Sequence, residues 1–112
     1  MSGYFQRQAE EEDFRRQVEE EERREERVMV DAVIAAYEAF VAAKDTLTER
    51  YAAWSDAYDE MEDRESHDGG ATIVQRRAVQ DLAAQHVIAL SARDKARDEV
   101  MAAVAALAGR KG

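Results

Sequence analysis

The stretch of sequence that decides the fold is residues 30–65, VDAVIAAYEAFVAAKDTLTERYAAWSDAYDEMEDRE. Its large side chains recur at alternating intervals of three and four residues, which is the heptad spacing of a seam between two helices. The positions of this predicted interaction seam are Val30, Val33, Tyr37, Phe40, Leu47, Tyr51, Trp54, Tyr58 and Met61. Lys44 occupies one further heptad position in mid-run, and Glu65 closes the series. The pattern predicts a long helix that packs along another helix.

Residues that break regular structure divide the chain at one internal point. The sequence has no proline, and its five glycines are Gly3, Gly69, Gly70, Gly109 and Gly112. Because Gly and Pro are the strongest local breakers, we expect an all-α fold, an antiparallel helical hairpin of two long helices with a coiled-coil-like seam. Its helices span about 28–66 and 72–108, with a turn at 67–71. A charged N-terminal helical extension, residues 1–27, precedes this hairpin of residues 28–112.

Residues around the turn carry the signals that end one helix and begin the next. Gly69 or Gly70 can adopt the left-handed conformation that closes a helix. Thr72, followed three residues later by Gln75, fits a capping box at the start of the second helix. Gly109 is expected to end that helix.

Lys44 and Asp94 are predicted to set the register of the hairpin. If the chain reverses at Gly69, antiparallel partners have residue numbers that sum to about 138. Lys44, the charge inside the first seam, then lies opposite Asp94, a charge that interrupts the apolar stripe of the second helix. We expect these side chains to form a partly buried pair. It would fix the register and add little stability, because desolvation offsets most of the attraction.

Residues 6–27 form a highly charged arm, with ten acidic and six basic side chains. Several acids precede a base by four residues, as in Glu11 and Arg15, which supports a solvated helix. One interpretation is an exposed helical extension or partly disordered arm. The other is a docking arm that uses Phe14 and Val18 as anchors on a partner.

Composition excludes several classes of function. A net charge of −9 and a pI near 4.7 oppose binding to a phosphate backbone, so no nucleic-acid partner is expected. There is no cysteine, and no apolar run approaches the roughly 20 residues that span a bilayer, so no membrane contact is expected. His67 and His86 are the two histidines, and neither stands in a catalytic or metal-binding pattern. We expect no catalytic residue, metal or cofactor, and a location in the cytoplasm or in an assembly made there.

Two functional hypotheses remain open. The first is a non-enzymatic structural or adaptor protein that self-associates into a homo-oligomer or docks into a larger protein assembly, such as a phage virion, as a component or assembly factor. The second is a small acidic inhibitor or regulator that covers a basic surface of a target protein. Its binding face would be the acidic cluster, residues 56–68, which contains one arginine.

One family shares the length and the hairpin form. The residues from Tyr58 to Glu62 match a Tyr-x-x-x-acid pattern, and Trp54 supplies a tryptophan. In these features the chain resembles the small W-x-G helical hairpins exported by type VII secretion. Here, however, Ser55 and Asp56 follow the tryptophan well before the turn, and the Tyr58 pattern precedes the turn instead of following the second helix. We therefore assign no family from these residues.

Overall fold

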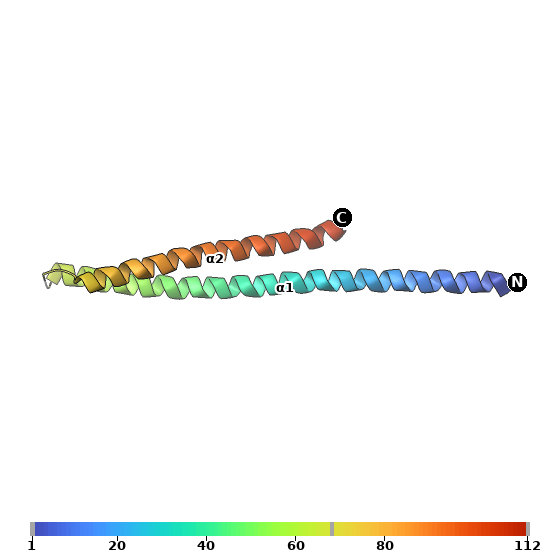
Figure 1. Cartoon of the computed structure of the whole chain (residues 1–112), viewed down its shortest axis with the longest axis horizontal. Coiled ribbons are helices and arrows are strands. Elements are labelled where there is room, and N and C mark those ends of the chain that lie inside the picture. The colour runs from blue at the N-terminus through green and yellow to red at the C-terminus, as the bar shows by residue number, and fades with distance from the viewer. Residues whose placement is uncertain (1, 68, 112) are drawn as a thin grey trace.

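A computed structural model describes residues 2–67 and 69–111. It consists of two helices, α1 (Ser2–His67) and α2 (Ile73–Lys111), which run antiparallel and lie side by side (Figure 1). The described residues contain no strand. The predicted all-α hairpin is confirmed.

Helix α1 determines the length of the molecule. Its 66 residues correspond to about 99 Å at 1.5 Å per residue, and the longest dimension of the molecule is 102 Å. The helix is continuous across residues 27 and 28, so the charged extension and the first helix of the hairpin are one element. This continuity is expected physically, because neither Gly nor Pro occurs between Gly3 and Gly69.

The turn between the helices depends on two glycines and a capping box. Gly69 and Gly70 have φ angles of 82° and 122°, a region that residues with a Cβ atom rarely adopt. The Gln75 backbone N–H donates to Thr72 Oγ1 at 3.2 Å, and the Thr72 N–H donates to Gln75 Oε1 at 3.1 Å. This reciprocal pair confirms the predicted capping box. Asp68, within the predicted turn, lies outside the described residues.

Helix α2 continues beyond its predicted end. Gly109 lies inside the helix, which reaches Lys111. Although α2 diverges from α1 towards this end (Figure 1), Arg110 bridges the gap. Its guanidinium donates to the Glu22 carbonyl oxygen at 2.9 Å and pairs with the Glu25 carboxylate. These contacts connect the last turn of α2 to α1 across the wider spacing.

The hairpin buries very little. Among the described residues, the buried hydrophobic side chains are Val79, Ala89 and Ala96, all in α2. The accessible surface is 8990 Å², whereas a compact monomer of this mass exposes about 6,200 Å². The radius of gyration is 27.3 Å, against about 13 Å for a compact domain of this length. One seam between two helices therefore holds the fold together, and much apolar surface stays outside it.

Candidate interaction surface

The face of α1 that packs on α2 carries only one half of the predicted seam. Five predicted positions are half-buried: Val33, Phe40, Leu47, Trp54 and Met61. The other four are exposed, by 38, 57, 53 and 36 % respectively: Val30, Tyr37, Tyr51 and Tyr58. The residues before Val30, Tyr37, Lys44 and Tyr58 are half-buried instead: Met29, Ala36, Ala43 and Ala57. At Tyr51 the preceding residue, Arg50, is exposed, and the Tyr51 ring lies 5.5 Å from that of His86 on α2. The seam of α1 is therefore rotated from the predicted one at four positions, while Tyr51 stays at the edge of the helix contact.

Side-chain size explains the rotation. Both Ala36 and Tyr37 stand at heptad distance from Val33 and Phe40, so either could lie between the helices. The alanine permits a close approach of the two backbones, while the tyrosine hydroxyl remains in water. The same rotation places Ala43 between the helices and leaves Lys44 exposed, which avoids the cost of burying an ammonium group.

The seam of α2 follows a strict heptad spacing. Its buried or half-buried members are Gln75, Val79, Leu82, His86, Ala89, Arg93, Ala96, Val100, Ala103, Leu107 and Arg110. Contacts across the hairpin fix the register, for example Arg50 to Gln85 at 2.7 Å and Arg76 to Glu65 at 3.3 Å. The paired residue numbers sum to 135 and 141 in these two contacts, which brackets the expected 138.

The expected pair between Lys44 and Asp94 is not formed. Lys44 is exposed, and its Nζ lies 5.9 Å from the centroid of the Phe40 ring. Asp94 instead contacts arginines of its own helix, Arg93 at 3.0 Å and Arg97 at 3.9 Å. None of the ion pairs among the described residues joins Lys44 to Asp94. Lys44 and Asp94 both lie beside the helix contact, where Arg93 and Arg97 occupy the Asp94 carboxylate and the Lys44 ammonium group approaches the Phe40 ring instead.

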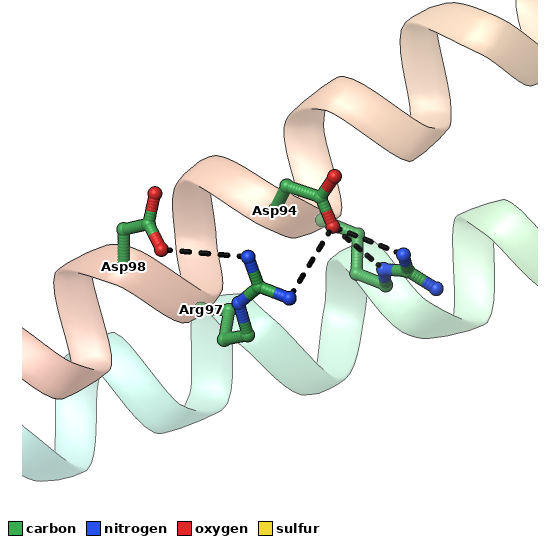
Figure 2. Close-up of polar contacts among 4 residues, drawn as sticks. Asp94, Arg97 and Asp98 are labelled. Carbon is green, nitrogen blue, oxygen red and sulfur yellow. Dashed lines mark hydrogen bonds and ion pairs between the residues drawn. The ribbon is translucent and has the colours of Figure 1, made fainter.

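Figure 2 shows a row of alternating charges on α2. The Arg97 guanidinium lies between two carboxylates, with Asp94 on one side and Asp98, at 3.6 Å, on the other. All three side chains are about half exposed or more, so each pair contributes little stability. The row does keep the middle of α2 polar where the helix would otherwise be apolar.

Four rings form a cluster in the half of the hairpin nearer the turn. Trp54 is central, with its ring centroid 6.0 Å from Tyr51, 5.5 Å from Tyr58 and 6.4 Å from His86. The Trp54 and His86 planes are nearly parallel, at 13°. His86 Nδ1 is buried without a hydrogen-bond partner. His86 is thus a packing residue of the seam, and one of its polar atoms opposes folding.

Replacing His86 with phenylalanine should stabilise the hairpin. The substitution keeps a stacked ring against Trp54 and removes the unpartnered buried nitrogen, a gain of about 1 kcal/mol in the free energy of unfolding. Urea unfolding followed by circular dichroism measures this difference. His67→Phe is the matched control, because His67 is exposed beside Asp63 near the end of α1. It should change stability by less than about 0.5 kcal/mol. A destabilised His86→Phe variant would show that Nδ1 has a partner in solution.

Carboxylates near the turn create a local negative field. The Tyr58 hydroxyl donates a hydrogen bond to Glu62, which is the main cause that raises the pKa of Tyr58 above its ordinary value of 10.0; the Glu62 charge, desolvation and the charges of Glu65 and Asp59 add to it. Each carboxylate favours the neutral phenol over the phenolate. Acidic side chains therefore surround Tyr58 on an exposed part of the surface.

One side of the hairpin carries large exposed apolar side chains. In two antiparallel right-handed helices, the residue that follows each seam position turns to the same side of the pair. We call this side the apolar face; its members are Val30, Ile34, Tyr37, Val41, Tyr58, Val87, Met101 and Val104. Ile34, Val87 and Met101 are 51, 59 and 63 % exposed.

The other side of α1 is built differently. The residues that precede the seam positions there are mostly alanines: Ala32, Ala35, Ala39, Ala42 and Ala53. The exposed large apolar residues on that side are Val28, Val74 and Ile88, which lie far apart along the rod, so the row of such side chains lies on the apolar face. The sequence prediction missed this row because it placed Tyr37 within the seam.

The N-terminal part of α1 extends past the end of α2 (Figure 1). Arg110 contacts α1 at Glu22 and Glu25, and α2 ends one residue later. The proposed anchors Phe14 and Val18 lie on this overhang and are 67 and 37 % exposed. Their position leaves them accessible, and their role as anchors stays a prediction.

The described residues offer no group of three or more His, Asp or Glu side chains placed to hold a metal ion. Nor does either helix, over the residues described, have a stretch long and apolar enough to cross a membrane. The hairpin is therefore a rod with one apolar face, an acidic cluster near the turn and a charged N-terminal part of α1 that extends past the end of α2.

Comparison with family models, curated proteins and solved structures finds no match for this chain.

Proposed function

We propose that the protein is a non-enzymatic structural or adaptor element that acts by helix-mediated self-association or by docking into a larger protein assembly. The observation that carries this proposal is the apolar face, a row of exposed Ile, Val, Tyr and Met side chains along one side of the rod. Soluble monomers rarely expose large apolar patches, and such patches mark interaction sites. A second helical surface is the partner whose shape suits it best.

The shape of the molecule supports a structural role. A rod 102 Å long and 18 by 15 Å across can span a distance or brace neighbouring subunits. The overhang of α1 provides a second contact region, with Phe14 and Val18 as exposed anchors. A virus particle, to which the protein would belong as a component or assembly factor, is one assembly that uses such elements.

The acidic cluster supports a second candidate function. Carboxylates gather near Tyr58 and raise its pKa, chiefly through its hydrogen bond to Glu62. Clustered negative charge attracts basic surfaces. In this alternative the protein is a small acidic inhibitor that binds a basic target through Asp59, Glu60, Glu62 and Asp63.

Two variants of the full chain distinguish these functions. The face variant replaces Ile34 and Met101 with glutamine, and the acid variant replaces Asp59, Glu60, Glu62 and Asp63 with lysine. Sedimentation and co-purification from the native source are the measurements. We expect the face variant to lose its association and the acid variant to retain it. The opposite pattern would favour the inhibitor.

A matched control comes from the opposite side of α2. Ile88 is 69 % exposed but precedes the seam residue Ala89, so it lies away from the apolar face. Ile88→Gln removes a similar apolar side chain and should leave association unchanged. An equal loss in the control would indicate unspecific hydrophobic association and would contradict a defined docking face.

A further inference from the structure

We propose that the apolar face is covered by a second copy of this chain, related by a two-fold axis parallel to the rods. Both turns then lie at the same end, and α1 of each copy lies over α2 of the other, giving a four-helix bundle in which neighbouring helices are antiparallel. This inference rests on the proposed function and specifies its partner and geometry.

Apolar side chains of the face occur at matching levels on the two helices. Residues of α1 and α2 whose numbers sum to 138 lie at the same height along the rod. Tyr37 is therefore level with Met101, and Ile34 is level with Val104. A two-fold axis along the rod brings each α1 residue opposite the partner's α2 residue of the same level. Tyr37 therefore meets the partner's Met101, a ring against a flexible thioether, which is a favourable contact.

Charges on the same side select this orientation. Lys44 is level with Asp94, so the axis along the rod places Lys44 opposite the partner's Asp94. Glu62 is level with Arg76 in the same way. A two-fold axis across the rod at the level of Lys44 would place Lys44 opposite the partner's Lys44 and Asp94 opposite the partner's Asp94. Facing like charges oppose association, so complementarity favours the parallel axis over this transverse one.

This arrangement gives Lys44 a role that the single hairpin does not. Within one chain its ammonium group approaches the Phe40 ring, and Asp94 contacts Arg93 and Arg97. Across the dimer, Lys44 would add a further cation to the exposed side of Asp94. The charges in mid-face then specify the register between copies, with apolar contacts on both sides of them.

The available area agrees with a stable dimer. Between residues 30 and 58 the face is about 42 Å long at 1.5 Å per residue, and the hairpin is 18 Å wide. A rectangle of these dimensions covers about 760 Å² per copy, or about 1,500 Å² in total, which is the size of a standard specific interface. The surface in excess of a compact monomer is larger still, about 2,800 Å² per chain, so the chain can supply it.

The chain has no cysteine, so single cysteines can report the orientation. The Lys44→Cys and Asp94→Cys variants carry tags of different length, so that their cross-linked products differ in size. They are mixed at equal concentration and treated with a short bifunctional maleimide. We expect the mixed 44-to-94 product to predominate over either self-linked product. Predominant self-linking of Lys44→Cys would show the axis across the rod and overturn the proposed geometry. Circular dichroism confirms that both variants fold.

Sedimentation equilibrium tests the dimer without modification. We expect a mass of twice 12.7 kDa, a dissociation constant raised at least about tenfold by Ile34→Gln with Met101→Gln, and no change with Ile88→Gln. A monomer at every concentration overturns this inference. If such a monomer still binds a co-purifying protein that the face variant loses, the proposed function stands with another occupant. If the face variant changes neither mass nor any bound protein, both proposals are overturned.

Discussion

Replacing Ala89 with aspartate is expected to lower the free energy of unfolding by about 3 to 5 kcal/mol, the range found when a charge is left buried and unpaired. Ala89 is 5 % exposed and lies in the α2 seam. The nearest cation along the seam is Arg93, four residues away, whose guanidinium already contacts Asp94. Because the hairpin buries so little, this loss should separate the helices at ordinary temperature.

The matched control is Ala92→Asp, since Ala92 is exposed on the same helix. It carries the same chemical change and should cost less than about 1 kcal/mol, mainly through lower helix propensity. Urea unfolding by circular dichroism gives both values, and small-angle scattering reports separation of the helices. Equal effects of the two substitutions would mean that Ala89 does not lie between the helices.

The hairpin could be predicted because its determinants are local. Gly69 and Gly70 stand at the one internal point where the backbone needs positive φ angles, and the Thr72 and Gln75 pair caps the next helix through neighbouring atoms. The register followed from chain length on either side of the turn. Each of these features depends on a few consecutive residues.

The rotation of the seam could not be predicted in the same way. Heptad spacing admits either Ala36 or Tyr37, and either Ala43 or Lys44, as inward residues. The choice depends on how closely the backbones approach, which is a property of both helices together. Alanines on α2 such as Ala89 and Ala96 permit the close approach, and a close approach favours small residues on α1 as well.

The close approach of the two helices also determines which residues lie on the candidate interaction surface. Once Ala43 lies inward, Lys44 lies at the side of the contact, where its ammonium group approaches Phe40 while Asp94 pairs with an arginine of its own helix. Tyr37 lies outward with it. Four of the nine predicted seam positions are exposed, although Tyr51 among them still contacts His86 on α2.

Trp54→Ala is expected to lower the free energy of unfolding by about 2 to 3 kcal/mol. A fully buried tryptophan costs about 3 to 5 kcal/mol when truncated, and Trp54 is half-buried, so the loss is smaller. Its ring contacts with Tyr51, Tyr58 and His86 all disappear together. The tryptophan contribution to the near-ultraviolet circular dichroism should be lost at the same time.

Tyr37→Ala provides the contrast, because Tyr37 is 57 % exposed although it fits the same heptad series as Trp54. Both substitutions are measured by urea unfolding in chains that also carry Ile34→Gln and Met101→Gln, so that association does not contribute. Tyr37→Ala should then change stability by less than about 0.5 kcal/mol. Similar losses for the two residues would place Tyr37 in the seam and remove it from the apolar face. A large loss for Trp54 alone separates the residues that hold the hairpin together from those that remain available to a partner.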